Sequence, residues 1–110
     1  MIPAGEALSL DALITTTAKG IASRVLARSA GGNVTLFAFD AGQGLTEHTT
    51  AFDALALVLS GSLTLTVGGA PVHAVDGTIV RLPANVPHAV DAPEAARMLL
   101  VMLRDPQPQE

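Results

Sequence analysis

The sequence predicts an all-β domain, either a sandwich or a barrel of short strands. In residues 62–67, SLTLTV, apolar and polar side chains alternate strictly, a period typical of strands that bury one face. Glycine-rich turns separate such runs about every eight to ten residues, and little of the chain has helical periodicity. Many short strands joined by turns of this kind are typical of β-sandwiches and barrels.

The composition indicates a protein that associates with itself. The 110 residues are enough for one domain. They are 49% hydrophobic and 15% charged, which is apolar for a small monomer. The longest apolar runs, residues 54–59 and 98–103, are far shorter than the roughly 18 residues of a membrane-spanning helix. We therefore expect no membrane span, and we expect a chain that hides an apolar face against another copy of itself.

Several classes of site and partner are disfavoured by residue counts. The chain has no cysteine, so disulfides and thiolate metal sites are excluded. The net charge is -4, no basic cluster is present, and three phenylalanines are the only aromatic residues apart from histidine, so nucleic acid is not expected as a partner. The N-terminus, MIPAGEALSL, lacks the basic start and apolar core of a signal peptide. We expect a cytoplasmic protein.

The first half of the chain contains three expected strands. Residues 1–20 are expected to form an arm or edge strand, with residues 9–14 as a helical turn or a short strand. The next strand, residues 21–28, ends at the turn-forming residues 30–33. Two further strands, residues 34–40 and 54–59, are apolar on both faces. We expect one face of each to line a barrel and the other to meet a second layer.

The second half contains turn signals and the remaining strands. Gly68-Gly69 and Asp76-Gly77 both predict hairpins. Pro71, near the start of the strand between them, favours an edge position. A strand at residues 78–82 precedes a proline-rich turn that leads to His88. The final expected strand is 97–104, and residues 105–110 are expected to form a flexible tail.

Two segments carry histidines at informative spacings. Gly42 stands six residues before His48 and Gly61 follows it, whereas Gly77, Pro83 and His88 form the second segment, with Asn85 between them. These segments resemble the two motifs of the cupin superfamily, in particular the small conserved-barrel, RmlC-like cupins. Asn85 replaces a motif glycine, and asparagine tolerates positive φ better than most residues. The resemblance covers residues 34–103. It implies a double-stranded β-helix, or jelly-roll barrel, at residues 21–104, a homodimer, and a pocket between the sheets.

The resemblance also suggests a metal site. Metal-binding cupins use three histidines and a glutamate, a set suited to Fe, Mn, Ni, Cu or Zn. This chain retains two of these ligands, His48 and His88, but has Thr50 and Ala54 at the other two positions. Either Asp53 or Glu47 is a candidate third ligand, which would complete a two-histidine, one-carboxylate triad suited to non-haem iron. The alternative is a histidine pair that bonds only to itself, to Thr50 or to water. The expected pocket contains His48, Thr50, Phe52 and His88.

Two functions remain open. The first is a binding module for a small molecule, with or without a divalent metal and without catalysis. The second is a metal-dependent enzyme of the dioxygenase type, or an isomerase or epimerase in which a histidine acts as the base. His73 lies outside both motifs and is expected at the surface or an interface. Arg81 is expected to pair with an acid on a neighbouring strand or subunit.

Overall fold

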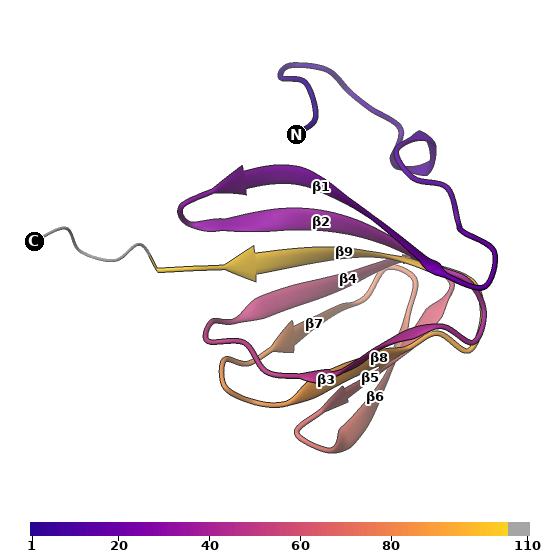
Figure 1. Ribbon diagram of the computed structural model, residues 1–110, viewed down its shortest axis with the longest axis vertical. Coiled ribbons are helices and arrows are strands. Elements are labelled where there is room, and N and C mark those ends of the chain that lie inside the picture. Colours follow the sequence, from indigo (N-terminus) through magenta and orange to yellow (C-terminus); the bar gives the residue numbers. More distant parts are fainter. Residues whose placement is uncertain (106–110) are drawn as a thin grey trace, which may run out of the picture.

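The computed structural model describes residues 1–105, and strands dominate them (Figure 1). One short 3-10 helix, η1, precedes the strands. The elements are η1 (Leu10–Ala12), β1 (Ile21–Ser29), β2 (Gly32–Phe39), β3 (Gly44–His48), β4 (Ala54–Ser60), β5 (Ser62–Val67), β6 (Ala70–Val75), β7 (Ile79–Leu82), β8 (His88–Asp91) and β9 (Ala96–Leu103).

The strands form two antiparallel sheets. One has five strands in the order β1-β2-β9-β4-β7, and the other has four in the order β3-β8-β5-β6. Among these strands the chain changes sheet six times, between β2 and β3, β3 and β4, β4 and β5, β6 and β7, β7 and β8, and β8 and β9. The two sheets lie against each other as the layers of a jelly-roll barrel (Figure 1). This confirms the predicted all-β fold class.

Strand β2 has the two apolar faces that its sequence predicts. Phe39 on one face is buried in the core between the two sheets. Leu36 and Ala38 on the other face are fully buried and pack with Ile14 of the N-terminal arm. The arm therefore forms the second layer. Within the region predicted as a helical turn or a strand, it forms η1.

The centre of the barrel is filled by side chains. Its largest fully buried residues, all below 2% exposure, include Phe39, Leu63, Leu65, Met98 and Val58. A core filled by side chains in this way leaves little room for a ligand. A binding site must therefore lie nearer to an end of the barrel than to its middle.

One of the two predicted hairpins is present and the other prediction was wrong. Gly68 and Gly69 have φ values of 58° and 82° and connect the paired strands β5 and β6. At Asp76-Gly77, only the glycine has positive φ. Strand β6 pairs with β5, whereas β7 pairs with β4 in the other sheet. The Asp-Gly turn thus carries the chain between sheets, because the partner of a strand is decided by distant residues and not by the turn alone.

Gly61 occupies a position that other residues would fill poorly. It joins β4 to β5 with a φ of 76°. A Cβ atom at this position would collide with the carbonyl oxygen of Ala95. The motif glycine after the first histidine therefore allows the chain to pass from one sheet to the other in a single residue.

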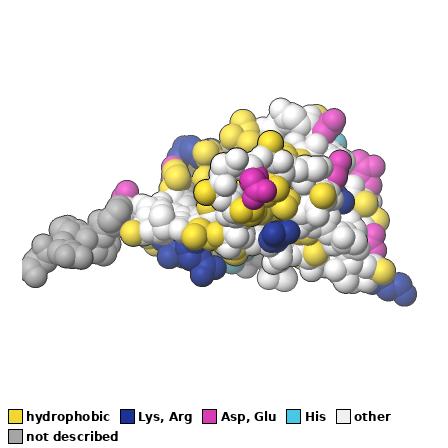
Figure 2. Space-filling model, turned by 90° about the horizontal axis from the view of Figure 1, so that it is seen from above, with side chains coloured by type: hydrophobic (Ala, Val, Ile, Leu, Met, Phe, Trp, Pro, Cys, Tyr) yellow, Lys and Arg dark blue, Asp and Glu magenta, His cyan; other side chains and the backbone are white. Residues whose placement is uncertain are grey.

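The surface shows no continuous basic patch in the view from above. Lys and Arg side chains lie apart from one another there, among hydrophobic and polar groups (Figure 2). Within residues 1–105, no helix is long and apolar enough to cross a membrane. Apart from Asp105, the predicted flexible tail lies outside the described residues.

Candidate functional site

The site is built around two histidines on adjacent strands. His48, the last residue of β3, is the direct partner of His88, the first residue of β8. Their Nε2 atoms are 3.1 Å apart, and the rings meet edge to face with centroids 4.3 Å apart. The predicted meeting of these two side chains is therefore present in the structure.

A β-bulge sets the direction of His48. Leu45 pairs with Val90 and His48 with His88, so three steps along β3 match two steps along β8. Strict alternation from Leu45 would turn His48 to the opposite face. The extra residue in the bulge returns it to the face that carries His88. His48 is therefore the last residue of a strand and not part of the loop that follows it.

The pair lies where the barrel interior opens to solvent. His88 and Val90 lie on the same face of β8, and Val90 belongs to the core. His88 is 4% exposed, and among the described residues it is the only buried one with a polar or charged side chain. His48 is exposed. One imidazole is thus embedded in the core while its partner faces the mouth.

Backbone carbonyls hold the outer nitrogen of each ring. The Nδ1 of His48 is 2.8 Å from the carbonyl oxygen of Thr46, and the Nδ1 of His88 is 3.2 Å from that of Val86. Because a carbonyl oxygen only accepts, each Nδ1 must carry the proton. In the neutral form of both rings, two acceptor nitrogens therefore lie 3.1 Å apart, with the rings edge to face.

The surroundings of His88 favour its neutral form more than water favours the neutral form of an exposed histidine. Burial is the main reason that the pKa of His88 is lowered below its usual value of 6.5. The nearby charge of His48 lowers this pKa further, and the bond to the carbonyl of Val86 opposes the change. A neutral imidazole is the form that binds metals.

Thr50 and Phe52 lie in a separate part of the mouth. The Thr50 hydroxyl donates to the carbonyl oxygen of Phe52 at 2.9 Å. Both residues line a surface hollow of about 350 Å³ together with Met102 and Arg104. The four predicted pocket residues therefore form two groups, the histidine pair and this hollow. The sequence analysis missed Met102 and Arg104, because only the pairing of β9 beside β4 brings the end of β9 to this loop.

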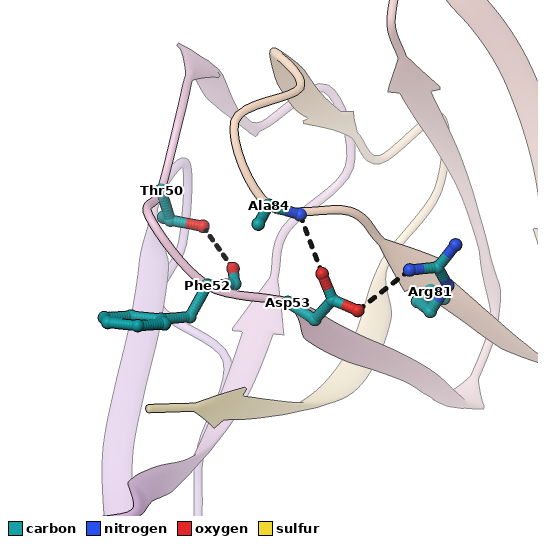
Figure 3. Close-up of polar contacts among 5 residues, drawn as sticks. All are labelled: Thr50, Phe52, Asp53, Arg81 and Ala84. Atoms are coloured by element: carbon teal, nitrogen blue, oxygen red, sulfur yellow. Dashed lines mark hydrogen bonds and ion pairs between the residues drawn. The ribbon is translucent and has the colours of Figure 1, made fainter. Parts of the chain in front are cut away.

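Neither candidate third ligand joins the histidines. The Asp53 carboxylate accepts hydrogen bonds from the Ala84 backbone N–H and the Arg81 guanidinium, each at 2.8 Å (Figure 3). Glu47 is exposed on β3. Within residues 1–105, no three histidine, aspartate or glutamate side chains gather closely enough to hold a metal. The protein itself thus offers two ligands.

His73 and Arg81 lie where the sequence analysis expected them. His73 is exposed on β6, an edge strand of its sheet. Arg81 on β7 pairs with Asp53, which directly precedes the neighbouring strand β4. Both side chains of this ion pair are partly solvated, at 62% and 36% exposure.

The fold and the site together define a small jelly-roll barrel protein with a histidine pair at its mouth. The family model described as the cupin domain matches residues 35–103, which is more than half of the chain. The chain therefore belongs to the cupin family.

Solved structures of similar proteins cover nearly the whole chain. A conserved protein of unknown function from Streptococcus pyogenes is 29% identical over 99% of this chain and 93% of its own, with a TM-score of 0.87. A cupin superfamily protein from Desulfitobacterium hafniense is 28% identical over 94% and 95%, also with a TM-score of 0.87. A cupin 2 conserved barrel domain protein from Leptotrichia buccalis is 32% identical over 88% of this chain and 47% of its own, with a TM-score of 0.84. A comparison with curated proteins found no match.

Proposed function

We propose that this cupin is a binding module that holds a divalent transition metal through His48 and His88 and a small molecule beside it. The observation that carries the proposal is the convergence of the two Nε2 atoms at 3.1 Å. Both Nδ1 atoms face carbonyl oxygens, so both Nε2 atoms are free to act as ligands when the rings are neutral. Such bonds to the outer nitrogen are a regular feature of metal-binding histidines.

The two histidine nitrogens fit a metal for which the protein supplies only some of the ligands. Histidine nitrogens bind Fe, Mn, Ni, Cu or Zn at distances near 2 Å, for example about 2.0–2.1 Å for zinc, which places two adjacent ligand nitrogens about 3 Å apart. The observed 3.1 Å is of that size. Thr50 and Ala54 occupy the other two family positions, so further ligands would come from water or a bound molecule. A metal held in this way would act as a Lewis acid toward an oxygen of that molecule.

The hollow beside Phe52 supports the small-molecule part of the proposal. Its volume of about 350 Å³ lies within the common range for ligand sites. Phe52 and Met102 offer apolar surface, and Arg104 offers a cation. This combination suits a small molecule that has an apolar body and an anionic group.

The metal-dependent enzyme is the second candidate, and the ligand set favours it less. An oxygenase of the facial-triad type needs a carboxylate beside the two histidines. The Asp53 carboxylate is already bonded to Ala84 and Arg81. An enzyme would reveal itself by turnover that falls in His48→Ala, whereas a binding module would lose affinity in that variant and show no turnover.

Metal binding can be tested by titrating the chelator-treated protein with Ni²⁺, Zn²⁺, Mn²⁺ and, without oxygen, Fe²⁺ in a calorimeter. We expect about one ion per chain in the wild type, and loss of binding in His48→Ala and His88→Ala. His73→Ala is the matched control, because His73 is exposed on β6, and we expect it to bind normally. Binding that survives both His48→Ala and His88→Ala would contradict the proposal.

The partner suggested by the composition is a second copy of the chain, and we propose the outer face of the five-stranded sheet as the contact. One row across this face consists of Leu36, Leu99, Leu57 and Ile79. The arm covers the β2 side, where Leu36 is 0% exposed, while Ile79 on β7 is 58% exposed. The exposed part of this aliphatic row could pack against the same row of a second copy. A contact of this kind agrees with the high hydrophobic content of 49%.

A further inference from the structure

Two loops at the barrel mouth lead directly to the histidines. Residues 49–53 follow His48 and connect β3 to β4. Residues 83–87 precede His88 and connect β7 to β8. The positions of the two imidazoles therefore depend on how these loops are held relative to each other.

Two hydrogen bonds join these loops directly, and their residues lie two to five positions from the histidines. The Asp53 Oδ1 accepts from the backbone N–H of Ala84 at 2.8 Å, and the Asn85 N–H donates to the carbonyl oxygen of Thr50 at 2.8 Å. Asn85 has a φ of 62°, a left-handed conformation that asparagine tolerates. The Asp53 Oδ2 accepts from Arg81 at 2.8 Å, which ties the first loop to β7 as well (Figure 3).

The strand that carries His48 needs such support. β3 is an edge strand, and β8 is its one neighbour in the sheet. Its pairing is interrupted by the bulge, after which His48↔His88 is the single remaining pair. Strand ends at an edge fray easily. Loop 49–53 begins directly after His48, so the way this loop is held restrains the end of β3.

We propose that Asp53 is a positioning residue, whose carboxylate clamps loop 49–53 onto loop 83–87 and thereby holds His48 against His88. The effect of this clamp on metal binding rests on the proposed function. Its effect on the position of the His48 ring against the His88 ring is independent of that function. Asp53 itself is well anchored, because its carbonyl oxygen accepts the Leu103 N–H at 3.1 Å. The Asp53 carboxylate thus acts on the site through the two loops and touches neither imidazole.

The test compares Asp53→Ala with Asp11→Ala in the full chain. Asp11→Ala is the matched control because it also removes a surface ion pair, to Arg97, in the N-terminal arm. The direct readout is the nuclear Overhauser effect between the His48 and His88 ring protons. Hydrogen exchange of the Ala84 amide, Ni²⁺ affinity and the urea unfolding midpoint are measured on the same samples.

We expect Asp53→Ala to lose the ring-to-ring effect and the protection of the Ala84 amide, and to bind Ni²⁺ about tenfold more weakly, as happens when residues that support metal ligands are changed. Asp11→Ala should leave all three unchanged. A ring-to-ring effect of full strength in Asp53→Ala, with a freely exchanging Ala84 amide, would overturn the positioning role. If the wild type binds no Ni²⁺, Zn²⁺, Mn²⁺ or Fe²⁺, the proposed metal function fails, and the ring-to-ring effect alone decides the positioning role.

A second variant covers the case in which Asp53→Ala does not fold. Asp53→Asn keeps an oxygen that can accept from Ala84 and removes the charge that pairs with Arg81. Because the Ala84 bond joins the loops, whereas the Arg81 bond ties loop 49–53 to β7, we expect Asp53→Asn to retain most of the ring-to-ring effect. Loss of this effect in Asp53→Asn, with the Ala84 amide still protected, would show that the loop-joining bond does not hold His48 and would overturn the proposal.

Discussion

His48 and His88 are 40 positions apart in the chain, yet they are direct partners across two strands, with their Nε2 atoms 3.1 Å apart. Each ring donates its Nδ1 proton to a carbonyl oxygen of its own segment. Local bonds therefore orient each ring, and the strand pairing brings the rings together. Two acceptor nitrogens thus lie side by side where β3 ends and β8 begins.

The stability of the metal-free protein should depend on pH through His88. Its pKa is lowered in the folded state, so between this value and 6.5 the unfolded chain binds more protons. The free energy of unfolding should therefore be highest above pH 6.5 and fall as the pH drops toward the folded-state pKa. Urea unfolding at pH 7.5 and 5.5, with a chelator present, measures this. His88→Gln should show a smaller pH dependence, whereas an unchanged dependence would contradict the assignment.

The Asp53 clamp should survive mild acid. The Ala84 N–H is the main cause of the lowered pKa of Asp53, and Arg81 adds to it. A carboxyl whose pKa is depressed in the folded state contributes its stability above the unfolded value, near 3.8, and loses it as the pH falls through the folded value. We expect the Ala84 amide to remain protected at pH 5 and through pH 3.8, and to lose protection only as the pH falls through the lower folded-state pKa of Asp53. Hydrogen exchange across this range checks the prediction, with the Leu65 amide as a core reference.

Substitutions at two glycines of positive φ distinguish the cost of backbone strain from the cost of a steric collision. Gly61 and Gly69 have φ values of 76° and 82°. A Cβ at Gly69 meets no other atom within 4 Å, whereas one at Gly61 strikes the carbonyl oxygen of Ala95. We expect Gly69→Ala to lower the free energy of unfolding by about 1 kcal/mol and Gly61→Ala to lower it by about 2–4 kcal/mol. Equal losses in urea unfolding would show that the contact at Gly61 relaxes without cost.

The proposed dimer contact predicts the effect of a charge at Ile79. A lysine at this exposed site should leave the fold intact but place two ammonium groups in the contact between copies. We expect the wild type to have the mass of a dimer by light scattering and Ile79→Lys to have the mass of a monomer. Val72→Lys on β6 is the control, since Val72 is also exposed, at 38%, but lies in the other sheet. A dimeric Ile79→Lys variant would place the contact elsewhere.

Much of the fold could be predicted from local patterns. The alternation in residues 62–67 marks β5, and the two glycines after it mark the hairpin to β6. The double-sided apolar pattern of β2 predicts a core on one face and a second layer on the other, as observed. These features depend on neighbouring residues alone, so the sequence contains them directly.

Other features depended on partners that are distant in the sequence. The Asp76-Gly77 turn looks like a hairpin, but the pairing of β7 with β4 makes it a connection between sheets. Thr50 and Phe52 are close to His48 in sequence, yet they line a hollow with Met102 and Arg104. No local pattern marks the partner of a strand, because backbone hydrogen bonds between strands are the same for any side chain.

The sequence by itself determined where most of the strands lie, though not β3 and β8, and where glycine allows the chain to turn. The tertiary structure decided that His48 and His88 share a face, because a bulge opposite β8 shifts the alternation of β3 by one residue. It also directed the Asp53 carboxylate to Ala84 and Arg81 instead of to the imidazoles. Side-chain direction follows from the register between distant strands, and that register is set only when the two sheets pack together.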